Sequence, residues 1–351
     1  MRGLIVKIKS ADVAKALGLS KATVSLALNG KPGVSQQTRQ KINEYIDMMK
    51  SESSINSNIN IKNDAISGTK GMIKVVSIIK RLQQSHESEL DFWIPQIEKL
   101  ARAANKEGYS FGITYVNMYE DDINQVIKEC SQDVVAGVIL YATEMLDKDY
   151  EMFKAISKPM VIYDCGMEKA EHHCILPDNR QGVRIAIKHL LNNNHRNIVY
   201  LANDIERYNF RERRSAFHET IVEHGLKYTS NQMITLGTSI GSTYLKMKKY
   251  LNEHNLPDAF VMENYQVSIG VTRALREKKI IVPNDVSLIG LEEISDYFTD
   301  NYRLSSIKVT HADYANTIIL LLKSEIESES GLKYKLLTAC SLIRGESVRG
   351  F

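Results

Sequence analysis

Cysteine is scarce in this chain of 351 residues, and no run of apolar residues is long. The four cysteines, Cys130, Cys165, Cys174 and Cys340, lie far apart and form no CxxC pair. This spacing disfavours a disulfide framework and a zinc knuckle, so we expect four reduced thiols. No stretch approaches the roughly 20 apolar residues that cross a membrane. The first ten residues, "MRGLIVKIKS", lack the apolar core of a secretory signal, so we expect a cytoplasmic protein with no membrane partner.

The usual signatures of enzymes are also missing. The segments "GTSIG" and "SGTKG" are not phosphate-binding loops of the GxxxxGK[ST] type, and no GxSxG nucleophile motif is present. His172, His173 and Cys174 could contribute metal ligands, but no second cluster supplies the rest of a ligand set. We therefore expect no catalytic residue, no cofactor and no metal, and a protein that is not an enzyme.

Positive charge is concentrated at the amino-terminal end of the chain. Residues 1–50 contain nine Lys or Arg and three Asp or Glu, a net charge of +6, although the whole chain carries only +3. The remaining residues are therefore mildly acidic. A basic head on an acidic body is typical of a nucleic-acid-binding module joined to another domain, although a solvated basic surface would show the same charge.

The basic head has the pattern of three short helices. Ser10, Ser20 and Ser35 are candidate caps for helices over about 11–17, 21–29 and 36–50, and Gly18 ends the first of them. A helix, a turn containing glycine and a second helix form a helix-turn-helix, whose second helix enters the major groove of DNA. The stretch "LGLSKATVSLALNG" contains this second helix.

The rest of the chain predicts a linker followed by two α/β lobes. Residues 51–71, "SESSINSNINIKNDAISGTKG", are rich in Ser, Asn, Ile and Lys without helical period, which is typical of a flexible tether. Beyond them, eight strand-like apolar runs, from "IKVVSII" to "DVSLIG", alternate with amphipathic stretches. Such alternation predicts parallel sheets with helical crossovers. Two series of runs predict two lobes with a ligand at the carboxyl ends of their strands.

Four segments together resemble the lac repressor (LacI/GalR) family of bacterial transcription regulators. They are "IKSADVAKALGLSKATVSLALNGKPGVSQQTRQKI", "PDNRQGVRIAIKHLLNNNHRNIVYLA", "PDAFVMENYQVSIGVTRALREKKIIVPNDVSLIGLEE" and "LIRGES". Their order along more than 300 residues matches the family. The resemblance implies a helix-turn-helix head (1–50), a hinge (51–71) and lobes of periplasmic-binding-protein type. It places 72–176 plus 303–333 in the first lobe and 177–302 plus 334–351 in the second.

The resemblance also implies a set of DNA-contacting residues on the second helix. Lys21 can donate to guanine or phosphate, whereas Ala22 and Leu26 offer only apolar contact, which suits a thymine methyl group. Many relatives carry arginine at the position of Leu26, so we expect one base contact to be absent; packing of Leu26 into the head is the alternative. The complete predicted set is Ser20, Lys21, Ala22, Thr23, Ser25, Leu26 and Asn29.

A second set of residues matches the positions at which the family holds its effector. Sugars are bound by carboxylates and amides that face hydroxyls and by aromatic rings that stack on the sugar. The predicted effector-binding residues are Phe92, Trp93, Asp164, Arg213, Asn264 and Glu292. We expect Arg213 to pair with both Asp164 and Glu292 and so orient the two carboxylates.

The resemblance implies a repressor that binds a near-palindromic DNA operator as a homodimer and responds to a small sugar-like effector. Two alternatives stay open. Residues 51–65 contain no Pro, Tyr or Leu, unlike the hinge helix of relatives, so the chain could sense a sugar with weak operator binding. A protein corepressor could also replace the sugar.

Overall fold

The structure is a computed structural model that describes residues 20–28, 34–35, 38, 69–80, 87–299, 302–309, 311–328 and 331–350. The chain divides into two units, Met1–Ser67 and Gly68–Phe351, which are considered separately. In the first unit the helix predicted over 21–29 is present as α2 (Lys21–Leu28). The amide of Thr38 donates to Ser35 Oγ, as expected of a helix cap at Ser35. The helix predicted over 11–17, most of the one over 36–50, and linker residues 51–68 lie outside the described residues.

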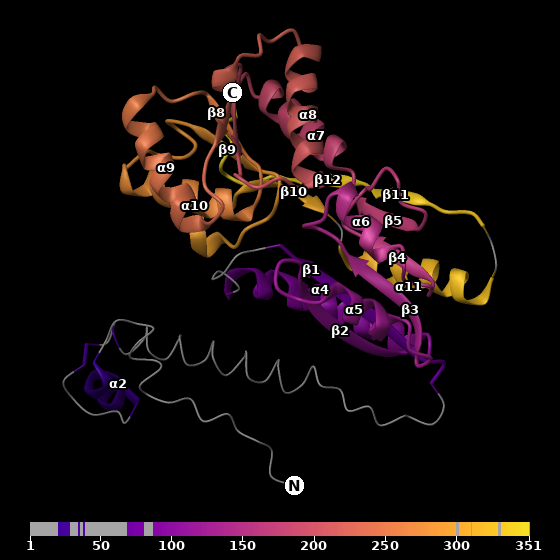
Figure 1. Ribbon diagram of the computed structural model, residues 1–351. Helices are drawn as coiled ribbons and strands as arrows, with labels where there is room; N and C mark the ends of the chain where they lie inside the picture. The colour runs from indigo at the N-terminus through magenta and orange to yellow at the C-terminus, as the bar shows by residue number, and fades with distance from the viewer. Residues whose placement is uncertain are drawn as a thin grey trace. The chain divides into compact units, whose positions relative to one another are not determined.

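Lobe 1 of the second unit is built on a six-stranded parallel sheet, seen edge-on in Figure 1. Its strand order is β11 (Lys335–Thr338), β5 (His173–Pro177), β4 (Met160–Tyr163), β3 (Val135–Tyr141), β1 (Met72–Ile79) and β2 (Ser110–Asn117). Helices α4 (Glu87–Lys106) and α11 (His311–Glu327) pack on one face through Leu100, Ile318 and Leu322. Helices α5 (Ile123–Cys130) and α6 (Asp147–Phe153) pack on the other.

Lobe 2 repeats this arrangement with a second six-stranded sheet. Its order is β12 (Cys340–Ile343), β10 (Ser305–Val309), β9 (Ser287–Gly290), β8 (Ala259–Met262), β6 (Ile198–Ala202) and β7 (Met233–Thr235). Helices α7 (Asn179–Asn192) and α8 (Tyr208–Glu223) cover one face, and α9 (Ile240–Glu253) and α10 (Tyr265–Glu277) cover the other. The 3-10 turns η1 (Ser230–Gln232) and η2 (Asp296–Thr299) complete it. Only β12 runs antiparallel to its neighbour.

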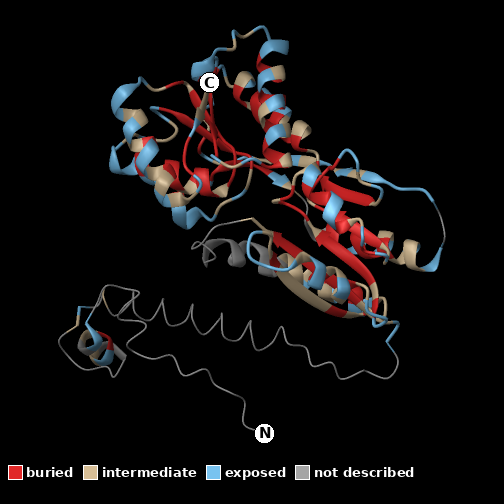
Figure 2. Ribbon diagram, viewed as in Figure 1, coloured by how far each residue is buried: buried red, intermediate tan, exposed pale blue. Residues whose placement is uncertain are grey.

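Burial follows the double cover of each sheet. Alternate residues of β1 enter opposite cores: Ile73 and Val75 face α4 and α11, whereas Val76 and Ile78 face α5 and α6. The inner strands are therefore buried on both sides and appear red in Figure 2, whereas the edge strand β2 is mostly half-buried. All four cysteines are free, as expected, and three of them are buried. No helix among the described residues is long and apolar enough to cross a membrane.

Three chain crossings join the lobes, and two of them lie later in the sequence than predicted. The first follows Pro177 and agrees with the expected position near Leu176. The expected return at 303 is wrong, because β10 pairs with β9 and β12 in lobe 2, and the chain returns only after Val309. The expected crossing at 333 is also early, because β11 pairs with β5 in lobe 1. In these parallel sheets a strand approaches the other lobe only at its carboxyl end. The chain therefore crosses between the lobes only after the last residue of a strand.

Candidate functional site

Helix α2 of the first unit presents a polar side that begins at its cap. The Ser20 hydroxyl accepts from the amide of Thr23 at 3.0 Å, which satisfies one of the free N–H groups at the helix start. Ser20, Lys21 and Ser25 are exposed, Thr23 and Leu26 are half-buried, and Val24 is fully buried. Lys21 and Ser25 therefore share one face, with Leu26 at its border. The side chain of Ala22 and all of Asn29 lie outside the described residues.

A cavity lies between the lobes of the second unit, where the strands of both sheets end. Four residues lie close to strand ends: Asp164 directly follows β4, and Thr143, Asn264 and Glu292 lie two positions beyond β3, β8 and β9. Pro177 and Val309, the last residues of β5 and β10, line the same space. The remaining lining residues are Tyr163, Arg207, Asn209, Phe210, Arg213, Tyr265 and Tyr314. The predicted residues Asp164, Arg213, Asn264 and Glu292 are thus brought together.

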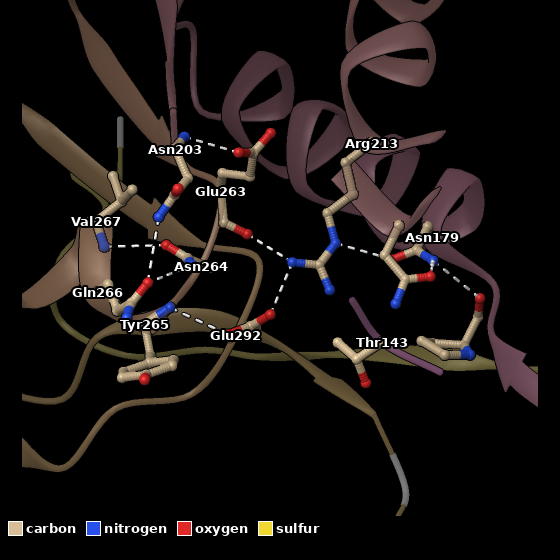
Figure 3. Close-up of polar contacts among 12 residues, drawn as sticks. Thr143, Asn179, Asn203, Arg213, Glu263, Asn264, Tyr265, Gln266, Val267 and Glu292 are labelled. Atoms are coloured by element: carbon tan, nitrogen blue, oxygen red, sulfur yellow. Dashed lines mark hydrogen bonds and ion pairs between the residues drawn. The ribbon is translucent and has the colours of Figure 1, made fainter. Parts of the chain in front are cut away.

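Arg213 is the centre of the polar network on the lobe 2 side, as Figure 3 shows. Its Nη1 donates to Glu292 Oε1 at 2.8 Å and to the carbonyl of Glu263 at 2.6 Å, and its Nε donates to Asn179 Oδ1 at 2.8 Å. The side chain is only 7% exposed. Burial lowers the pKa of Arg213, but the Glu292 carboxylate outweighs this and raises it, so the guanidinium stays charged.

Asp164 is connected to Arg213 by two amides rather than by the direct pair that we expected. Asn209 Nδ2 donates to Asp164 Oδ1 at 3.0 Å, and Asn179 Nδ2 donates to Asn209 Oδ1 at 2.9 Å. Asp164 Oδ2 accepts from the Thr143 hydroxyl at 2.6 Å. The direct pair fails because Asn179 occupies the space beside Arg213 Nε. Burial raises the pKa of Asp164 to about 6, against the lowering by the Thr143 hydrogen bond and by the charge of Arg213.

The backbone of Asp164 adopts φ of +65°, in the left-handed region that few residues other than glycine occupy. Asp and Asn tolerate this region best, because their short polar side chains bond locally. Here the carbonyl of Asp164 also accepts from Asn209 Nδ2 at 3.1 Å, so one amide holds both the backbone and the side chain. A strained residue held this firmly is typical of a functional site.

Asn264 and Glu292 organise the start of α10. The Asn264 side chain accepts from the amide of Val267 at 3.0 Å and caps the helix, so its oxygen serves the helix. Its Nδ2 donates to Gln266 Oε1. Glu292 Oε2 accepts from the amide of Tyr265 at 3.0 Å, which leaves this carboxylate fixed between Arg213 and the helix. These contacts hold the lobe 2 wall of the cavity rigid.

Several cavity residues escaped the sequence analysis. Arg207, Asn209 and Phe210 come from the cap and first turn of α8. Tyr163, Tyr265 and Tyr314 supply aromatic walls. Among these, Tyr163 had a usable signal, since it directly precedes Asp164 at a strand end. The predicted aromatics Phe92 and Trp93 belong to α4, but their side chains lie outside the described residues.

The cavity combines ring-sized apolar walls with carboxylates, an amide and guanidinium groups. Its formal charges nearly cancel: Arg207 and Arg213 oppose Asp164, Glu292 and the nearby Glu144. A neutral molecule with several hydroxyls matches this balance better than an anion does. The open space is about 60 Å³, roughly that of two water molecules, so the lobes must separate to admit a sugar ring.

The His172–His173 pair takes part in packing between strands and helices. His172 Nδ1 lies 2.6 Å from the Tyr150 hydroxyl, and His173 Nδ1 accepts from the amide of Tyr334 at 2.9 Å. His173 Nε2 lies 3.0 Å from Glu325. Across the described residues, no three His, Cys, Asp or Glu side chains gather as metal ligands would.

Two family profiles match the chain in the order of its two units. The profile described as "Bacterial regulatory proteins, lacI family" matches residues 10–50, and the one described as "Periplasmic binding protein-like domain" matches residues 187–348. Among curated proteins, the transcriptional repressor PurR of Glaesserella parasuis serovar 5 is 24% identical over 284 residues, which cover 81% of this chain and 79% of that repressor. The transcriptional regulator AscG of Escherichia coli K12 is 24% identical over 312 residues, 88% of this chain and 89% of AscG.

Solved structures show the same fold. A lac repressor dimer bound to operator and the anti-inducer ONPF matches with a TM-score of 0.67 and 21% identity, over 97% of this chain and 98% of that one. A complex of the transcriptional regulator CelR with cellobiose matches with a TM-score of 0.68 and 19% identity, over 97% of this chain and all of the other.

Proposed function

Because the chain belongs to the lacI family of bacterial regulatory proteins, we propose that it is a transcriptional repressor whose DNA affinity is set by a small molecule bound between its lobes. The observation that carries the proposal is the pairing of two parts: a DNA-binding profile at residues 10–50, and a cavity lined by Asp164, Arg213, Asn264 and Glu292 in the second unit. A ligand that prefers one lobe arrangement shifts the population of DNA-binding states.

In this proposal α2 is the helix that enters the major groove. Ser20 and Lys21 begin the helix and are exposed, which suits contact with phosphate and with guanine. Thr23, Ser25 and Leu26 lie on or beside the same face, and Ala22 and Asn29 complete the proposed contact set. The half-buried Leu26 keeps some apolar surface free for a thymine methyl group. The protein would act in the cytoplasm, where its DNA is.

The proposed effector is a neutral, hydroxylated ring such as a sugar. Asp164 and Glu292 would accept hydrogen bonds from hydroxyls, Arg213 would donate, and Tyr265 or Phe210 would pack against the apolar ring face. Phe92 and Trp93 stay proposed contacts by their position in the family. Sugar-sized ligands need several such groups at once, and these groups come from the ends of three strands, β4, β8 and β9, and from α8.

A homodimer would place two α2 helices on the two halves of a near-palindromic operator. The described surface offers an apolar patch for such an interface on lobe 2, where the rings of Tyr297 and Phe298 lie 5.5 Å apart and are 81% and 38% exposed. Monomeric proteins rarely leave neighbouring large apolar side chains open to water.

A thermal-shift screen with a panel of sugars and nucleosides tests the effector site. A compound at about 100 times its dissociation constant adds roughly 2.7 kcal/mol of stability, which is readily measured. We expect at least one neutral sugar to raise the melting temperature of the wild type and not that of Arg213→Met. Stabilisation by no member of the panel, or equal stabilisation of the variant, would contradict the proposed site.

A second candidate is a sugar sensor that has lost tight operator binding. It is favoured by the composition of residues 51–65, which contain no Pro, Tyr or Leu to form the hinge helix of relatives. Salt dependence separates the two candidates. For a repressor, the logarithm of the affinity for one preferred duplex falls linearly with the logarithm of the salt concentration, with a slope of about −0.9 per neutralised phosphate. A repressor also discriminates between DNA sequences.

A further inference from the structure

We propose that Glu144 of lobe 1 and Arg207 of lobe 2 form a clasp, an ion pair between the lobes that couples two changes. When the lobes close, Glu144 positions Arg207 in the wall of the cavity. Glu144 lies in the segment between β3 and α6, and Arg207 is the residue that precedes α8. Arg207 Nη2 lies 2.6 Å from Glu144 Oε1. The pair therefore joins the two sheets at the edge where both end. Arg207 is thus a positioned cavity residue, and Glu144 is the residue that positions it.

Burial makes this pair different from the surface ion pairs of the protein. The side chains of Arg207 and Glu144 are 9% and 11% exposed, whereas those of Arg184 and Glu223 on the surface of lobe 2 are 49% and 54% exposed. A buried charge without its partner is strongly unfavourable. When the lobes separate, both groups regain water. Both charges are therefore stabilised in the open state by water and in the closed state by each other. A half-closed state, in which one charge is buried alone, is unfavourable.

Glu144 is held in place from its own lobe. Its Oε2 accepts from the amide of Lys80 at 2.7 Å, directly after β1. The Lys80 side chain in turn pairs with Asp149, which also accepts from the amide of Leu146. Lobe 1 thus holds this carboxylate through Oε2, and Oε1 contacts Arg207 of lobe 2.

Arg207 is similarly placed by its own lobe, and it has hydrogen-bonding capacity to spare. Its guanidinium carbon lies 5.4 Å from the centre of the Phe210 ring, one turn along α8. Arg207 lines the cavity, and its buried Nε has no hydrogen-bond partner within the described part of the chain. Such a donor favours a ligand that brings an acceptor oxygen to it.

The neighbours of Arg207 on α8 also dock on lobe 1, so the clasp belongs to a defined surface. Tyr208 packs on the lobe 1 core. The Tyr208 hydroxyl lies so close to Gly166 that a Cβ added to this glycine would be 2.5 Å from it. Asn209 holds Asp164. The guanidinium of Arg211 lies 3.6 Å from Asp147. The first turn of α8 is therefore the part of lobe 2 that recognises lobe 1, and Arg207–Glu144 is its buried ion pair.

Hydrogen exchange on the full-length protein tests the clasp without ligand or DNA. The variants are Glu144→Gln, Arg207→Met, both together, and the conservative Arg207→Lys. Exchange is followed at residues 142–147 of lobe 1, at 205–211 of lobe 2, and at strand β8 as a report on the fold. Glu206→Gln is the matched control, because Glu206 neighbours Arg207 and, among the described residues, forms its ion pair with Arg211 of its own lobe.

The clasp predicts that either single variant raises exchange roughly tenfold in both inter-lobe segments, while β8 is unchanged. The double variant should be no worse than one single variant, because the two residues act through one contact. Arg207→Lys and Glu206→Gln should behave like the wild type. Acceleration confined to the altered lobe, additive effects, acceleration that includes β8, or no change would each overturn the clasp. The clasp rests on the proposed function only for its regulatory use. A negative result in hydrogen exchange therefore does not affect the sugar screen, and a negative sugar screen does not affect the hydrogen-exchange test.

Discussion

At the scale of single residues, we expect substitution of Arg213 to reduce the stability of the protein strongly. It is buried, and it holds Glu292, the carbonyl of Glu263 and Asn179 at once. Arg213→Met leaves Glu292 without its cation, so we expect the free energy of unfolding to fall by about 3 kcal/mol in urea titrations. Arg184→Met, which removes an exposed pair, should change it by less than about 1 kcal/mol. Equal effects of the two substitutions would contradict the assigned network.

Asp164 predicts a pH dependence of stability. Its pKa is raised to about 6 by burial, above the ordinary value of 3.8, so the folded protein holds this proton more tightly than the unfolded chain. Stability from this group is therefore full below pH 4 and is lost as pH rises through 6, by up to ~3 kcal/mol. Asp164→Asn should be more stable than the wild type at pH 8 and equal to it near pH 4. A constant difference between the two across this pH range would count against a raised pKa.

Asp164, Arg213, Asn264 and Glu292 were placed by the family resemblance, and Asp164, Asn264 and Glu292 also lie within two residues of a strand end, whereas Arg213 lies within α8. The amide relay through Asn179 and Asn209 could not be placed in the same way. Which face a helix turns toward a second lobe depends on how the lobes meet, and the periodicity of one helix carries no such information. For the same reason the Arg207–Glu144 pair could not be predicted from the sequence.

At the scale of elements, the eight strands predicted from apolar runs are confirmed, because strands covered on both faces are apolar throughout. Strands β5, β10, β11 and β12 were not among the eight predicted runs, and β5 is a short strand that begins at the polar His173. The wrong lobe assignment of β10 and β11 has another cause: a short run does not reveal which sheet it joins, and hydrogen-bonded neighbours decide this in three dimensions.

Helix α2 carries a prediction about DNA. Lys21 is exposed directly after the Ser20 cap, where a cation can reach a phosphate or a guanine. Lys21→Ala should weaken binding to a preferred duplex and, if Lys21 of each subunit contacts one phosphate, reduce the slope of log affinity against log salt by about 1.8 per dimer. Lys128→Ala, an exposed lysine of lobe 1, serves as the control. An unchanged affinity and slope in Lys21→Ala would remove α2 from the DNA interface.

At the scale of the whole molecule, the proposed dimer depends on an apolar patch of lobe 2. Tyr297 is 81% exposed and lies beside Phe298. A charge at this position would be buried without a partner in an interface, so Tyr297→Glu should shift sedimentation from dimer to monomer at micromolar concentration. Tyr119→Glu, at a site of lobe 1 where the tyrosine is 60% exposed, should stay dimeric. A dimer that survives Tyr297→Glu would place the interface elsewhere.

Selection of duplexes from random DNA by the purified full-length protein tests the central claim most directly. A dimer with two copies of α2 should enrich one sequence with two related half-sites in inverted orientation, about one helical turn apart from centre to centre. Lys21→Ala should enrich it less. Recovery of no common sequence, or of a single unpaired half-site, would contradict the account of this protein as a dimeric, operator-binding repressor.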